Sequence, residues 1–162
     1  MTALRQKWLS LPPSLRWSLI ILFYLSLIGG YLLWQYQRPS GAALYSHNHT
    51  DRPIFSYWVN DRWGGNASAH GGGGAVCCSR IQGDTLKVVW IVSRTREQAD
   101  RGLQEERHEL DIPNPPRQRE DQYLHVHFLP GNQVRLAWNY TVASPLAQEL
   151  AERYPRKRHD DL

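Results

Sequence analysis

Hydrophobic positions follow two different patterns along the chain. From Trp17 to Gln37 no residue is charged, and apolar side chains are nearly continuous. At about 1.5 Å per helical residue this run spans roughly 30 Å, the thickness of the hydrocarbon core of a bilayer. It therefore predicts one transmembrane helix over residues 17–37. Beyond it, apolar and polar residues alternate over short segments, which is typical of strands.

Three of these later segments give the clearest strand signals. Residues 54–60 are rich in β-branched and aromatic side chains. In residues 85–92 the alternation puts four apolar side chains on one face: Leu86, Val88, Trp90 and Val92. In residues 123–129 it separates Leu124, Val126 and Phe128 from Tyr123, His125 and His127. Turn residues at 130–133 then join this strand to residues 134–138 as a hairpin.

The remaining segments complete a mostly β organisation. Residues 94–107 are highly charged and predict a short surface helix or an ordered loop, and the three prolines of 113–119 require extended chain. Ser144 as N-cap and Pro145 at the first position predict a short C-terminal helix. We expect a small antiparallel β-sandwich-like domain at 44–142, after an N-terminus (1–16), the helix (17–37) and a linker (38–43), and before a C-terminal helix and charged tail (143–162).

The charge distribution argues against a nucleic-acid-binding protein. The net charge is +4, but four of the 19 basic residues flank the apolar helix, whereas all 15 acidic residues follow it. The part beyond the helix is therefore formally neutral. We expect no nucleic-acid partner.

The same basic residues predict the orientation in the membrane. Arg5, Lys7 and Arg16 precede the apolar run and only Arg38 follows it closely, so the positive-inside rule places the N-terminus in the cytoplasm. The prediction is a single-pass protein of a Gram-negative inner membrane with its C-terminal domain in the periplasm. The alternative is a cleaved signal peptide, because small residues occupy 40–43.

A glycine-rich segment, residues 63–78, holds the most unusual chemistry. His70 followed by Gly71 to Gly74 is similar to an oxyanion-hole loop, but the chain has no G-x-S-x-G nucleophile motif and no alternating βα pattern. A loop that needs glycine for close backbone approach is the simpler interpretation. Cys77 and Cys78 are adjacent, and the sequence leaves open a vicinal disulfide, two free thiols, or a metal or redox role.

Histidines raise the question of a metal site. His47 with His49 and His125 with His127 each form a His-x-His pair, which points two rings to one face of a strand. Nothing in the spacing shows that the two pairs meet. The alternative is that these side chains are solvent-facing or hydrogen-bonded strand residues, and we expect neither a resident metal nor another cofactor.

Four ordered blocks of sequence carry a family resemblance. They are residues 47–54 (HNHTDRPI), residues 59–66 (VNDRWGGN), residues 70–78 from the His-Gly run to the two cysteines, and residues 124–131 (LHVHFLPG). Together they make the chain similar to the bacterial domain of unknown function 3304 family. The resemblance implies a secreted or lipid-anchored periplasmic protein, and some members resemble immunity partners of type VI secretion phospholipase effectors. The lipoprotein members have a lipid-modified cysteine that is absent here.

These observations predict a non-enzymatic, membrane-anchored binding module. Its partner is expected to be a secreted protein toxin, which the domain would occlude as an immunity protein. The candidate partner-binding residues are Trp58, Trp63, Asn66, His70, Gly71, Gly72, Gly73 and Gly74, although plain core filling is an equally good role for the two tryptophans. The alternative function is a metal- or thiol-dependent envelope protein centred on His70, Cys77 and Cys78.

Overall fold

The computed structural model describes residues 11–37 and 41–155. The chain divides into two units, residues 1–39 and 40–162. In the first, helix α2 runs from Pro13 to Gln37 and has no buried residue. Its 25 residues extend about 37 Å, so it is long and apolar enough to cross a membrane. Parts of three predicted segments lie outside the described residues. They are residues 1–10 of the predicted cytoplasmic N-terminus (1–16), residues 38–40 of the linker, and the charged tail after residue 155.

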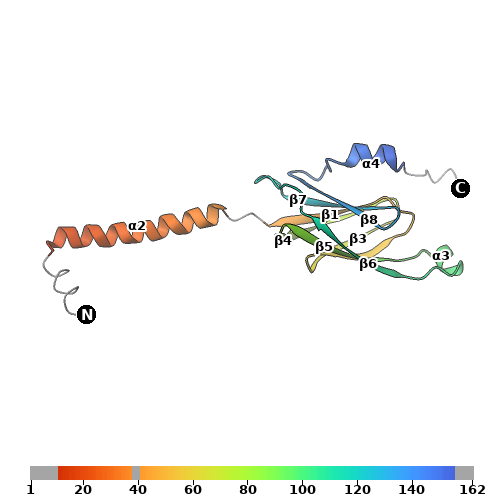
Figure 1. The fold of residues 1–162 in the computed structure, drawn as a ribbon, viewed down its shortest axis with the longest axis horizontal. Helices are drawn as coiled ribbons and strands as arrows, with labels where there is room; N and C mark the ends of the chain where they lie inside the picture. Colours follow the sequence, from red (N-terminus) through yellow and green to blue (C-terminus); the bar gives the residue numbers. More distant parts are fainter. Residues whose placement is uncertain (1–10, 38–40, 156–162) are drawn as a thin grey trace. The chain divides into compact units, whose positions relative to one another are not determined.

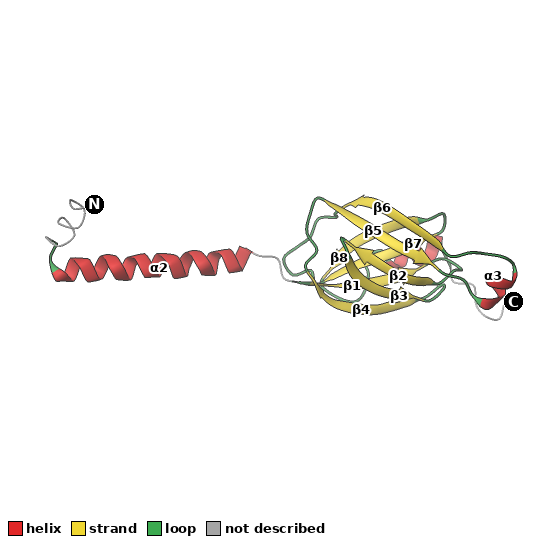
Figure 2. Ribbon diagram, turned by 90° about the horizontal axis from the view of Figure 1, so that it is seen from below, coloured by secondary structure: helices red, strands yellow, loops and turns green. Residues whose placement is uncertain are grey.

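The second unit is a sandwich of two four-stranded sheets, as the alternating pattern predicted (Figure 2). The first sheet has the order β4-β1-β7-β8 and the second has β3-β2-β5-β6. Their bounds are β1 Ala42–Asn48, β2 Ile54–Val59, β3 Arg62–Ala67, β4 Gly72–Ser79, β5 Thr85–Val92, β6 Glu106–Pro113, β7 Tyr123–Leu129 and β8 Gln133–Asn139. Strand β1 thus begins two residues before the predicted start of the domain at residue 44.

The core lies between the two sheets and uses the apolar faces that the sequence indicated. The four predicted residues of β5 are all buried, at 7% exposure or less, and Leu124, Val126 and Phe128 of β7 are at most 1% exposed. Tyr57 from the second sheet meets Phe128 from the first edge-to-face, with 5.3 Å between ring centroids. The hydrophobic contact between the sheets therefore stabilises the fold.

Strands β1 and β7 pair in parallel, which departs from the predicted antiparallel arrangement. All other strand pairs are antiparallel. The parallel register places Tyr45 opposite His125 and His47 opposite His127. This pairing brings together two histidine pairs that lie 78 residues apart in the chain.

The hairpin between β7 and β8 is confirmed, and its turn uses the predicted residues. Gly131 and Asn132 both have positive φ, at 76° and 58°, which glycine and asparagine tolerate best. The charged segment contains helix α3, Arg96–Asp100, whose N-cap Thr95 forms a capping box with Gln98. Strand β6, which follows, was not predicted.

The C-terminal helix α4, Ala147–Arg153, begins later than predicted. Its N-cap is Leu146, which forms no side-chain cap, so the prediction of Ser144 as the cap is wrong. The Ser144 hydroxyl instead accepts the Leu146 N–H at 3.1 Å and contacts His127 in β7. Figure 1 shows α4 on the side of the first sheet that faces away from the second.

Candidate functional site

Asn48 is the structural centre of the sequence block at residues 47–54. It is 3% exposed, and its Nδ2 donates to the carbonyl oxygens of Arg52 at 2.8 Å and Ser68 at 3.1 Å. Its Oδ1 accepts the backbone N–H and the hydroxyl of Thr50, at 3.0 and 2.8 Å. All four hydrogen-bonding positions of the amide are therefore used. Asn48 fixes the β1–β2 loop and the turn between β3 and β4 at the same end of the sandwich.

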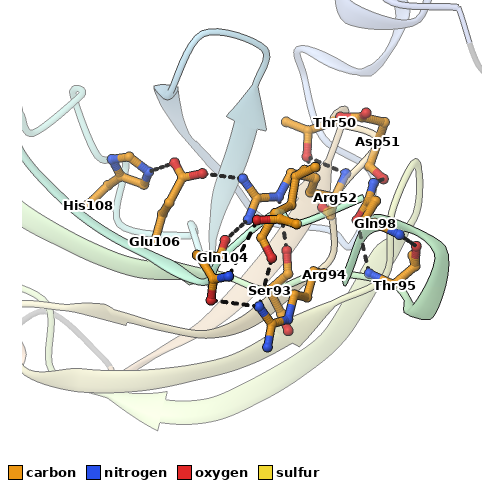
Figure 3. Close-up of polar contacts among 12 residues, drawn as sticks. Thr50, Asp51, Arg52, Ser93, Arg94, Thr95, Gln98, Gln104, Glu106 and His108 are labelled. Atoms are coloured by element: carbon orange, nitrogen blue, oxygen red, sulfur yellow. Dashed lines mark hydrogen bonds and ion pairs between the residues drawn. The ribbon is translucent and has the colours of Figure 1, made fainter. Parts of the chain in front are cut away.

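Arg52 ties that loop to the second sheet, as Figure 3 shows. Its Nε donates to the Ser93 carbonyl at 3.0 Å, its Nη2 donates to the Gln104 carbonyl at 2.5 Å, and its Nη1 pairs with Glu106. The hydrogen bond from Arg52 is the main reason that the pKa of Glu106 is lowered. The planar guanidinium suits such a three-way contact, which an ammonium group cannot reproduce.

A cavity of about 410 Å³ opens at this end of the sandwich. Part of its wall is core: Ile54, Trp90, Val92 and Phe128. His49, Asp51 and His70 are among the polar residues that line it. His70 stands in the β3–β4 turn with a φ of 48°, and its backbone N–H donates to the Thr50 carbonyl at 2.8 Å.

The outer face of the second sheet carries exposed aromatic side chains. Trp58 of β2 and Trp63 of β3 are cross-strand partners. Trp63 is 55% exposed, and its Nε1 donates to the Ser56 hydroxyl at 2.7 Å. Phe55, also on β2, is 64% exposed. Neither tryptophan belongs to the core cluster, so the core-filling alternative fails for both; Trp90 and Trp138 fill that role.

A hollow of about 310 Å³ adjoins Trp58 on this face. Val89 and Ile91 of β5 supply apolar surface, while Asp61 and Arg107 add charges of opposite sign. We call Trp58, Trp63 and these four residues the tryptophan face. The sequence indicated only its two tryptophans. The alternation in residues 85–92 could also have indicated Val89 and Ile91, because the odd-numbered residues share the strand face opposite the buried one.

The glycine-rich segment is not one presenting loop. It comprises β3, a turn and β4, which lie in different sheets. A Cβ on Gly73 would overlap the Asn66 carbonyl oxygen and the Ser46 hydroxyl, whereas a Cβ on Gly74 would meet nothing within 4 Å. Gly73 therefore permits close approach of the two sheet edges. Among the predicted binding residues, Asn66 is exposed on β3, and His70 and Gly71 occupy the turn.

The residues of the alternative function do not come together. Cys77 and Cys78 are bonded to each other and lie toward the end of β4 that pairs with the start of β1. His70 lies beyond the other end of β4, roughly 20 Å away at about 3.3 Å per strand residue. In the described ranges, 11–37 and 41–155, no group of three or more His, Cys, Asp or Glu side chains is placed to hold a metal ion.

Four histidines form an ordered array on the outer face of the first sheet. His47 Nε2 lies 2.9 Å from His125 Nδ1, and His49 Nε2 lies 3.0 Å from His127 Nδ1. The rings of His47 and His127 stack with centroids 4.3 Å apart and an interplanar angle of 7°. The two β7 histidines are buried, at 0% and 1% exposure. We call these four residues the histidine array.

One hydrogen bond defines where His125 carries its proton, and burial disfavours a second proton on either histidine of β7. His125 Nε2 faces the Thr141 carbonyl oxygen at 3.1 Å, and an oxygen that only accepts requires the proton on Nε2. A neutral His125 then accepts the His47 N–H at Nδ1. Burial lowers the pKa of His125. Burial, and then electrostatic repulsion by the other three histidines and Arg135, lowers the pKa of His127 from 6.5 to about 2.

Ser144, His127 and His49 have the geometry of a nucleophile, a base and an orienting group. The Ser144 hydroxyl lies 2.7 Å from His127 Nε2. A base with a pKa near 2 accepts a proton poorly at neutral pH, however, and Ser144 is only 8% exposed. The arrangement holds chain segments together more readily than it activates the hydroxyl.

Comparison with known families places this geometry in context. A family model described as a protein of unknown function, DUF3304, matches residues 47–136. The chain belongs to the DUF3304 family. The region matched to DUF3304 includes Asn48, Arg52, the tryptophan face and the histidine array, but it ends before the C-terminal segment that covers the array. No curated protein and no solved structure matches the chain.

Proposed function

We propose that the chain is a membrane-anchored binding module whose tryptophan face docks a protein partner. The observation that carries the proposal is the exposure of Trp63, 55%, beside the hollow at Trp58. Tryptophan is enriched among the residues that contribute most to protein interfaces, and a hollow next to it accepts an anchoring side chain. Asp61 and Arg107 at the hollow add polar contacts that orient the partner.

The partner that we propose is a secreted toxin of the phospholipase effector type, which the domain neutralises by occlusion. The basis is the resemblance to family members that are similar to immunity proteins, together with a domain that is formally neutral and offers an apolar docking face. Helix α2 would hold the domain at the outer side of the inner membrane, where such an effector arrives.

A reporter enzyme that is active only in the periplasm, fused after Leu162, tests that orientation. Activity of a cytoplasmic reporter at the same position would contradict it.

The binding test uses the full chain in detergent micelles and a purified secreted phospholipase of the proposed effector type. We expect Trp63→Ala to weaken binding at least about 30-fold, the effect of losing about 2 kcal/mol at an interface hot spot. Tyr140→Ala is the matched control, because Tyr140 is 66% exposed and lies outside the tryptophan face. Calorimetry gives both affinities.

Cell survival separates occlusion from other activities. Cells that produce the effector in the periplasm should survive with the wild-type chain and with the Tyr140→Ala variant, but not with Trp63→Ala. If Trp63→Ala and Tyr140→Ala bind the effector with equal affinity, the tryptophan face is not the docking surface. Normal binding without protection would instead show that docking alone does not neutralise the effector.

A further inference from the structure

The C-terminal segment of the β domain lies across the outer face of the first sheet. We define residues 140–154 as the C-terminal strap. Its contacts with the sheet include three polar ones: Thr141 with His125, Ser144 with His127 and Glu149 with Arg135. Leu150 of α4 is completely buried. Two of these polar contacts therefore end on histidines of the array.

Burial of both rings, and not the strap contacts themselves, favours the neutral form, because the Thr141 hydrogen bond taken alone raises the pKa of His125. His125 already donates from Nε2, so a second proton would go on Nδ1, 2.9 Å from His47 Nε2, and His47 would have to give up its own N–H at that atom to accept it. Protonation of His127 would add a charge at a site that is 1% exposed and beside three other imidazoles. A buried charge without an opposite partner is strongly unfavourable.

We propose that the histidine array is an acid-sensitive latch, which holds the C-terminal strap on the sheet near neutral pH and releases it when the imidazoles take up protons. Release exposes the face formed by β1 and β7 and frees the strap from the sheet. The latch does not depend on the identity of the docking partner.

The charged and titratable groups around the array favour release on acidification. From β1 they are Tyr45, His47 and His49; from β7, Tyr123, His125 and His127; from β8, Arg135; and from the strap, Glu149, Arg153 and Tyr154. Arg135 repels a proton on His127, and the other three histidines do so as they become protonated. Glu149 of α4 pairs with Arg135 at 2.5 Å.

The sign and the size of the effect follow from linkage. The closed form keeps His127 neutral down to a pKa of about 2, whereas a released ring recovers its ordinary value of 6.5. The strap is therefore fully held above pH 6.5, and the opening equilibrium rises about tenfold per pH unit below it for His127 alone. His125, whose pKa is lowered in the same direction, makes the dependence steeper.

The test is amide hydrogen exchange of the full chain in detergent micelles between about pH 7.5 and about pH 5. Measured rates are corrected for the intrinsic pH dependence of exchange. The pKa of Glu149 lies below its ordinary 4.5, so its pair with Arg135 stays ionised throughout. We expect protection of residues 146–154 to fall at least about tenfold per pH unit below 6.5, while peptides of β5 keep theirs.

Two variants identify the sensor. His127→Gln keeps an amide that can bond to Ser144 but cannot take up a proton, so the loss of strap protection per pH unit should be about tenfold smaller than in the wild type. Adding His125→Gln should abolish the pH dependence of strap protection. His70→Asn, outside the array, should keep the full dependence.

Constant protection of the strap down to pH 5 would overturn the proposal. So would parallel loss of protection in β5, which would indicate global acid unfolding, or an unchanged pH dependence in His127→Gln. The single variant decides the matter even if the double variant does not fold.

Discussion

Neighbouring glycines in β4 should respond to the same substitution with opposite signs. A Cβ on Gly73 would overlap the Asn66 carbonyl oxygen and the Ser46 hydroxyl, which are bonded to each other at 3.1 Å. Ser46 is completely buried, so separating this pair leaves a hydroxyl without a partner. A Cβ on Gly74 meets nothing within 4 Å. Gly73→Ala should therefore destabilise the domain, whereas Gly74→Ala should not.

The expected magnitudes follow from these contacts. Overpacking costs about 1–3 kcal/mol and an unsatisfied buried hydroxyl about 1–3 kcal/mol, so Gly73→Ala should lower the free energy of unfolding by about 2–6 kcal/mol. That is a large part of the roughly 5–15 kcal/mol typical of a domain. Gly74→Ala should raise it by about 0.5–1 kcal/mol, because alanine loses less backbone entropy than glycine in a strand.

Denaturant unfolding of the full chain in detergent micelles, followed by tryptophan fluorescence, measures both changes. The β domain contains the buried Trp90 and Trp138 as reporters. A thermal scan of the same samples gives a second measure. At about 4 °C per kcal/mol for a domain of this size, the melting temperatures of the two variants should differ by at least about 10 °C. Equal stabilities would refute the inference that Gly73 is required by close packing between β3 and β4.

Three further substitutions test other parts of the site. Asn48→Ala should lower the free energy of unfolding by about 2–4 kcal/mol, because buried groups lose their partners, and chemical denaturation measures it. Arg52→Lys should raise the pKa of Glu106 toward its ordinary value, measured by NMR titration, because the main cause of the lowering is removed. Trp63→Ala should lower the free energy of unfolding by no more than about 1–3 kcal/mol, because the buried Ser56 hydroxyl loses its partner, while it weakens docking.

Local patterns predicted the elements that bury one face. The alternation in β5 and β7 and the turn between β7 and β8 lie within a few neighbouring residues, so the sequence carries them directly. Strands β4 and β6 have no buried residue and therefore lack the hydrophobic periodicity that marks a strand. Each is one of the two edge strands of its sheet, where polar and glycine residues are common.

The candidate site was predictable only where it depends on one segment. Trp58 and Trp63 were recognised as docking candidates, but their hollow needs Val89 and Ile91 from β5 and Arg107 from β6. The role of Asn48 also escaped prediction, because its partners at Arg52 and Ser68 come from two separate connections. Such contacts are set by the sheet topology and have no signature in the spacing of residues.

The histidine array shows how topology changes the chemistry of a motif. Each His-x-His pair predicts only that two rings share a face, and in an isolated strand that face meets water. The parallel pairing of β1 with β7 puts the two pairs side by side, and residues 140–154 then cover them. Once covered, the imidazoles must bond to one another and to the strap, and their neutral form becomes the stable one. The strap lies outside residues 47–136, so the environment of these histidines depends on a segment beyond the region that matches the family model.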